Sequence, residues 1–77
     1  MDRTTVQPMT LDEAKVLVGH LLEAAGGDAE IVIGALLHVE RAGQDQDWYT
    51  DAHSERNALY RDALADVTGK AEYLFRV

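Results

Sequence analysis

The stretch that decides the fold is residues 10–28, which read TLDEAKVLVGHLLEAAGGD. Its apolar residues recur every three or four positions, so at 100° per residue they share one side of a helix. Thr10 and Glu13 have the spacing of a capping box, in which the side chain of each residue accepts a hydrogen bond from the backbone N–H of the other. Gly26 and Gly27 follow the last periodic residue, where glycine commonly ends a helix. The sequence therefore predicts an amphipathic helix that begins after Thr10 and ends before Gly26.

A second helix is expected from Asp28, a natural N-cap, to about Ala42, with Gly43 at its end. Apolar side chains surround most of its circumference. The polar strip is narrow and consists of Glu30, Gly34, His38 and Arg41. A helix that is apolar nearly all round must be covered on several sides. We therefore expect one of two arrangements. The chain forms a homo-oligomer, which we predict to be a dimer packed through the first two helices, or it has a groove that receives a partner helix.

Residues 43–50 form a polar connector, and a third helix is predicted to begin with Thr50 or Asp51 as its cap and to end at Gly69. The apolar arc of this third helix contains Ala52, Leu59, Tyr60, Ala63, Leu64 and Val67. Its opposite, solvated face is expected to carry Glu55, Asn57, Arg61, Asp62 and Asp66. Residues 70–77 alternate between apolar and polar, which is the strand period, and so predict an extended tail.

Length and composition indicate one small globular domain. The chain has 77 residues, of which 47% are apolar and 27% charged, and it contains no cysteine. Disulfides and thiolate metal sites are thereby excluded. The fold class we predict is all-α: a three-helix domain over residues 10–77 with an extended C-terminal tail, preceded by a flexible lead-in over residues 1–9. A chain this short buries only about 60–65% of its unfolded surface, which also favours a partner.

Charge and patterning narrow the classes of function. Fourteen acidic residues against seven basic ones give a net charge of −7, which disfavours nucleic acids and anionic membranes and favours a partner with a basic surface. No apolar run approaches the roughly 20 residues of a membrane span. Met1–Met9 contain no apolar signal region, so we expect a cytoplasmic protein. Arginine outnumbers lysine and alanine is the commonest residue, a bias typical of GC-rich bacterial or phage genomes.

Candidate catalytic and metal-binding residues are few. Ser54 is the only serine, and its neighbour His53 would point about 100° away from it on a helix, so the two cannot form a nucleophile–base pair. His20, His38 and His53 lie one in each predicted helix, without the Glu-x-x-His spacing of bundle metal sites. We expect no catalytic residue, no metal, no cofactor and no enzyme activity. A bundle that binds a small ligand or metal through these histidines stays open as an alternative.

The most suggestive residues lie around the start of the third helix. Tryptophan, tyrosine and arginine are enriched at the hot spots of protein interfaces. Four residues of these types lie here together with one histidine. The five residues are Trp48, Tyr49, His53, Arg56 and Tyr60. Arg56 falls inside the apolar arc near a helix N-terminus, where the helix dipole disfavours a cation. A purely structural interpretation has Trp48 covering the core and Arg56 pairing with Asp45 or Glu40.

The leading functional hypothesis is a small acidic protein-binding regulator, such as an inhibitor, an antitoxin-like factor or an adaptor. It would act by occluding a partner protein, with these five residues as its binding patch. A further alternative is a structural subunit of a larger homo-oligomer.

Overall fold

Three helices and one short terminal turn make up residues 7–74, the part of the chain that the computed structural model describes. The helices are α1 (Leu11–Ala24), α2 (Ala29–Gly43) and α3 (Asp51–Thr68), and a 3₁₀ helix, η1 (Ala71–Leu74), follows them. The all-helical prediction is therefore confirmed for the described residues. Residues 7–9, the end of the expected lead-in, have no helical structure, and residues 1–6 lie outside the described part.

The caps of α1 and α2 form as their sequences predict. The Glu13 N–H donates to Thr10 Oγ1 at 3.2 Å, and the Thr10 N–H donates to Glu13 Oε1 at 3.0 Å. The bonds that the Glu13 carboxylate accepts from the Thr10 N–H and from the Thr10 hydroxyl lower the pKa of Glu13. The Asp28 side chain accepts the Glu30 N–H at 3.0 Å. Between the two helices Gly26 and Gly27 have φ angles of 68° and 83°, a region where a side chain would be strained, so the sharp turn requires glycine at both positions.

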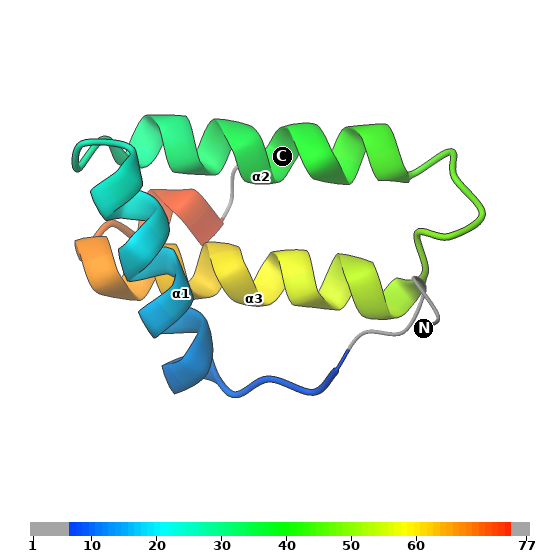
Figure 1. The fold of residues 1–77 in the computed structure, drawn as a ribbon, viewed down its shortest axis with the longest axis horizontal. Coiled ribbons are helices and arrows are strands. Elements are labelled where there is room, and N and C mark those ends of the chain that lie inside the picture. Colours follow the sequence, from blue (N-terminus) through cyan, green and yellow to red (C-terminus); the bar gives the residue numbers. More distant parts are fainter. Residues whose placement is uncertain (1–6, 75–77) are drawn as a thin grey trace.

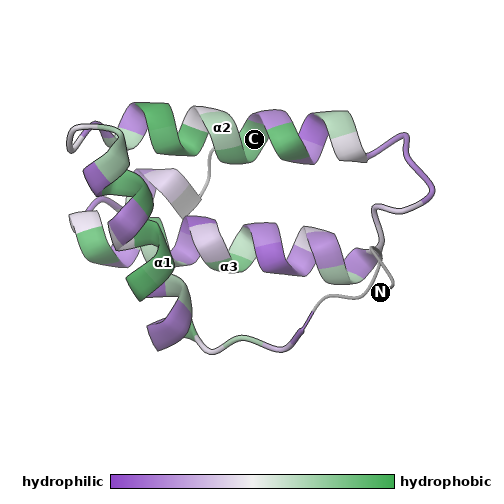
Figure 2. Ribbon diagram, viewed as in Figure 1, coloured by the Kyte–Doolittle hydropathy of each residue, from purple (hydrophilic) through white to green (hydrophobic). Residues whose placement is uncertain are grey.

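The helices α2 and α3 lie side by side with their axes nearly parallel, and α1 crosses them at one end (Figure 1). Both α1 and α2 pack mainly against α3 and make few contacts with each other. The buried core joins all three helices and η1 and consists of Ala14, Val18, Val32, Ile33, Leu36, Ala63, Leu64, Ala65 and Tyr73. Figure 2 shows that α1 and α2 are more hydrophobic than α3. This difference matches the sequence, since α3 contains six charged residues, against four in α1 and three in α2.

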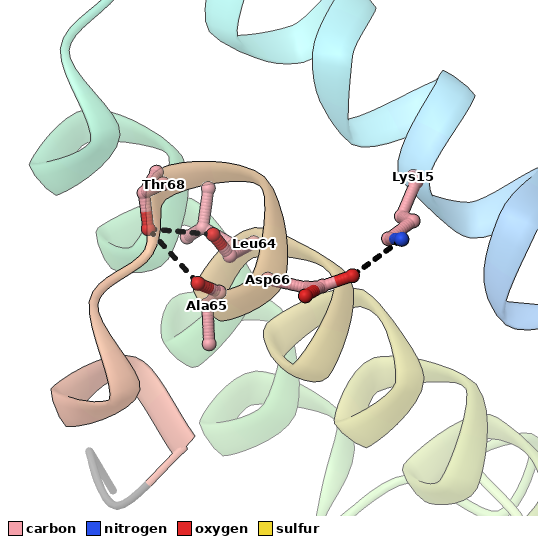
Figure 3. Close-up of polar contacts among 5 residues, drawn as sticks. All are labelled: Lys15, Leu64, Ala65, Asp66 and Thr68. Atoms are coloured by element: carbon pink, nitrogen blue, oxygen red, sulfur yellow. Dashed lines mark hydrogen bonds and ion pairs between the residues drawn. The ribbon is translucent and has the colours of Figure 1, made fainter.

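Two polar contacts lie near the junction of α1 with the C-terminal end of α3 (Figure 3). Lys15 forms an ion pair with Asp66, and this contact raises the pKa of Lys15. Two residues further along α3, the Thr68 hydroxyl donates to the Leu64 carbonyl at 2.7 Å. This bond ties the last side chain of the helix back to the preceding turn.

The extended tail expected over residues 70–77 is wrong for residues 71–74, which form η1. Gly69 ends α3 in the left-handed conformation, with φ at 71°, and turns the chain back toward the helices. Tyr73 is thereby brought into the core, where only 1% of its surface stays exposed. The apolar residue in the alternating pattern that decides this local structure is Tyr73, which is buried in the core and does not belong to a strand. The last part of the expected tail, residues 75–77, lies outside the described residues.

Asn57 is also placed differently from the prediction. It was expected on the solvated face of α3, but it is buried, with 4% of its surface exposed. Its amide group faces α2, where Nδ2 donates to the Leu36 carbonyl at 2.9 Å. Because a carbonyl oxygen only accepts, the side of the amide toward Leu36 must be the NH₂ group.

In the described part of the chain no helix is both long and apolar enough to cross a membrane.

Candidate functional site

A groove lies between the C-terminal half of α2, the connector and the N-terminal half of α3. It has a volume of about 220 Å³ and is lined by Leu36, Val39, Trp48, Tyr49, His53, Arg56, Asn57 and Tyr60. We call these eight residues the aromatic groove. The five residues singled out in the sequence all belong to it. Leu36, Val39 and Asn57 complete its wall and were not predicted to be part of a site.

The position of Tyr49 depends on the glycine at position 43, which has no side chain. Gly43, the last residue of α2, is buried, and a Cβ atom added to it would collide with the ring of Tyr49. The connector then turns back on itself, because the Gln46 N–H donates to the Gly43 carbonyl at 2.9 Å and the Tyr49 N–H donates to the Gln46 carbonyl at 3.1 Å. Gly43 thus ends the helix as predicted, and it also leaves the space that the Tyr49 ring occupies.

Glu40 joins the three segments behind the groove. Its carboxylate accepts hydrogen bonds from the Tyr49 hydroxyl and from Ser54 Oγ, the latter at 2.8 Å. Burial and the neighbouring Glu40 carboxylate raise the pKa of Tyr49 to about 12. Ser54 therefore donates to Glu40 and not to His53. The sequence signal for this role was the single acid that interrupts the apolar side of the second helix.

The three rings around the connector form one cluster. The ring of Tyr49 stacks on His53 with centroids 5.4 Å apart, and Trp48 meets both rings edge-on at 5.5 Å. The Thr50 N–H donates to His53 Nδ1 at 3.2 Å, so this nitrogen carries no proton and the ring is held against the N-terminus of α3. Trp48 remains 45% exposed. The indole of Trp48 is thus positioned by two ring contacts and is still accessible to solvent.

Arg56 supplies a cation at the edge of the groove. Its Nη1 donates to the Tyr60 hydroxyl at 3.4 Å, and its guanidinium carbon lies 5.9 Å from the centre of the Tyr60 ring. The expected pairing with Asp45 or Glu40 is wrong, since within residues 7–74 the Arg56 guanidinium contacts Tyr60 and forms no ion pair with either carboxylate. Glu40 is instead bound by two hydroxyl groups. The guanidinium therefore keeps donors that no carboxylate of this region occupies.

Asn57 contributes a buried acceptor to the wall. While its Nδ2 binds Leu36, its Oδ1 is buried and accepts no hydrogen bond from any residue in the described range. A buried polar atom without a partner costs about 1–3 kcal/mol. Asn57 was missed as a site residue because the helical arc was drawn through the apolar positions alone.

The histidines do not gather into a metal site. Within the described residues, which include all three histidines, no group of three or more His, Cys, Asp or Glu side chains could hold a metal ion. His20 and His38 are exposed, whereas His53 is half-buried in the aromatic groove. No family model matches the sequence, and neither a curated protein nor a solved structure is significantly similar to it. The groove itself therefore has to carry any argument about function.

Proposed function

We propose that this chain is a small acidic protein-binding regulator, such as an inhibitor, an antitoxin-like factor or an adaptor, which acts by occluding its partner. The observation that carries the proposal is that Trp48, Tyr49, His53, Arg56 and Tyr60 surround one groove. Hot spots of protein interfaces combine aromatic and arginine side chains around a pocket that excludes water. Here an exposed indole and a guanidinium that is in ion-pair contact with no described carboxylate lie at the same opening.

The size of the groove favours a protein partner over a small molecule. Its volume of about 220 Å³ falls below the roughly 300–1,000 Å³ of typical ligand pockets. A space of this size suits one large side chain of a partner. The net charge of −7 would draw the domain toward a basic surface, which raises the rate of association more than the final affinity.

Self-association is a second part of the proposal. Both α1 and α2 leave large apolar side chains exposed, among them Leu17, Leu21, Ile31 and Val39. Exposed apolar residues that cluster on two neighbouring helices favour a contact with another chain. We propose a cytoplasmic homo-oligomer that carries one aromatic groove on each copy.

The groove is tested by capture of a partner with matched variants. The wild-type chain, the double variant W48A/R56A and the control V67A/K70A are immobilised and exposed to a bacterial lysate, and the bound proteins are identified by mass spectrometry. Val67 is as exposed as Trp48, at 45%, and with the exposed Lys70 it lies outside the groove. Circular dichroism first establishes that all three chains are folded.

The proposal expects one protein that the wild type and the V67A/K70A control retain and that W48A/R56A loses. Equal retention by all three chains would place the interface elsewhere. No specific protein on any bait would contradict the regulator. A rise in melting temperature with divalent metal ions or nucleotides would favour the alternative of a ligand-binding bundle.

A further inference from the structure

The floor of the aromatic groove is formed by Leu36 and Asn57, which are buried, while the rest of its lining is half-buried or exposed. Asn57 lines this groove and is absent from the lining of three other hollows within residues 7–74. Its Nδ2 donates to the Leu36 carbonyl, whereas its buried Oδ1 accepts no hydrogen bond from residues 7–74. The floor therefore contains one acceptor without a donor, and the lining around it is almost entirely apolar.

We infer that the aromatic groove binds a tryptophan side chain of the partner protein, whose indole N–H donates to Asn57 Oδ1. The inference rests on the proposed function, since it names the group that the groove takes from its partner. When a partner displaces water from the groove, a buried acceptor that meets no donor weakens binding. Tryptophan has a large ring with one N–H donor and no acceptor. It therefore matches a floor that has one acceptor in an apolar setting.

The walls of the groove are suited to a ring. They include the side chains of Trp48, Tyr49, His53 and Tyr60. Aromatic rings attract one another in offset or edge-on arrangements by more than the area they bury. The volume of about 220 Å³ takes a single side chain, and tryptophan is among the residue types enriched at interface hot spots. The walls and the floor thus select the same kind of side chain.

A lysine or arginine of the partner is disfavoured in the groove by charge. No carboxylate lines it. The nearby Glu40 carboxylate already accepts bonds from Tyr49 and Ser54. The Arg56 guanidinium in the lining would repel a second cation, and a buried charge that meets one neutral acceptor is costly. The basic residues of a partner would instead contact the acidic surface outside the groove.

Other neutral side chains fit the floor less well. A phenylalanine or leucine would fill the groove and leave Asn57 Oδ1 without a donor. A tyrosine hydroxyl would meet Oδ1, but it would also bring its own acceptor lone pairs to an apolar floor. Among the large side chains, tryptophan alone combines one donor with no further polar atom.

The test compares two probes that differ in the donor group. One is N-acetyl-tryptophanamide, and the other is its analogue with benzothiophene in place of indole, so that sulfur replaces the N–H. Two-dimensional NMR of the isotope-labelled chain follows the Trp48 indole N–H and the Asn57 side-chain amide while each probe is added. The same titrations are made with N57L, which removes the acceptor, and circular dichroism first establishes that this variant is folded. N-acetyl-tyrosinamide and N-acetyl-lysinamide are the competing probes.

The wild type should bind the tryptophan probe, with shifts at the aromatic groove, and should bind the benzothiophene analogue about 10-fold more weakly or worse. N57L should bind these two probes equally, because the cycle of variant and probe isolates the contact between the N–H and Oδ1. If N57L does not fold, a nuclear Overhauser effect between the probe's indole N–H and the Asn57 amide protons of the wild type tests the same contact.

Several outcomes would overturn the inference. Equal binding of the indole and benzothiophene probes to the wild type would show that Oδ1 receives no donor. Tighter binding of the lysine or tyrosine probe would give the groove to another side chain. No binding of the tryptophan probe up to its solubility would remove tryptophan as the occupant, while capture of a partner through the groove would stand. Conversely, a tryptophan probe bound at Asn57 with no partner captured would support the inference and contradict the regulator alone.

Discussion

Replacing Gly43 with alanine should destabilise the domain, although alanine is the better helix former. Gly43 closes α2 and does not have a positive φ angle, so alanine brings no backbone strain. Its methyl group would nevertheless overlap the ring of Tyr49. To make room, Tyr49 has to move away from Glu40 and from the stacked ring of His53.

The expected magnitude follows from three contributions. Forcing an extra methyl group into a packed site costs about 1–3 kcal/mol. Losing the hydrogen bond from Tyr49 to the Glu40 carboxylate adds about 1.5–3 kcal/mol when it is lost completely. The intrinsic gain of alanine over glycine in a helix returns about 0.5–1 kcal/mol. Because the ring can shift in part, we expect a net loss of about 1–3 kcal/mol of unfolding free energy.

The assay is thermal and urea unfolding of G43A beside the matched variant G19A. Gly19 lies inside α1, and a Cβ atom added there would meet no atom within 4 Å. In a domain of this size 1 kcal/mol shifts the melting temperature by about 4–8 °C, so G43A should fall by about 5–20 °C and G19A should rise by a few degrees. Trp48, the only tryptophan, reports the rearrangement through its fluorescence. A G43A variant as stable as G19A would refute the packing argument.

Three further predictions concern single hydrogen bonds. Replacing Asn57 with aspartate, which when ionised has no donor for the Leu36 carbonyl, breaks that bond and should cost about 1–3 kcal/mol or more in urea unfolding; no loss would mean that the bond is not formed in solution. The pKa of Tyr49 is raised to about 12, so the folded state keeps a proton that the unfolded state loses near pH 10, and stability should fall as the pH rises from about 10 to 12. In calorimetry, Y49F should lack that decline, and an identical profile for both chains would count against the buried hydroxyl of Tyr49. Replacing Thr10 with alanine removes the N-cap side chain of α1 and should cost about 1 kcal/mol in thermal unfolding, measured against the control T10S, which keeps a hydroxyl at the cap.

The helices could be predicted from the sequence because their ends are set by local chemistry. The box of Thr10 and Glu13, the cap at Asp28 and the left-handed Gly69 act within a few residues of the chain. A pattern of residue types contains that information directly. That the five patch residues lie close together was also expected, because they are near in sequence, three of them at helical spacing. Their function remains a proposal.

What the sequence did not reveal depends on contacts between distant segments. Asn57 is polar and looked solvated, yet a carbonyl 21 residues away holds it inside. Tyr73 was assigned to an extended tail, yet burial of one ring in the core decides the shape of that turn. The packing of Tyr49 against Gly43 likewise depends on the path of the connector, which turns back toward the end of α2. Tertiary contacts override the local pattern at each of these positions.

The packing of α1 on α3 also constrains how the chain can fold during its synthesis. Since α1 makes few contacts with α2 and depends on α3, most of the apolar side of the first helix stays uncovered until α3 has left the ribosome. Bringing the two together requires closure of a loop that contains the whole of α2, which slows folding relative to a bundle of neighbouring hairpins. During that interval the apolar side chains of α1 and α2 are open to other molecules.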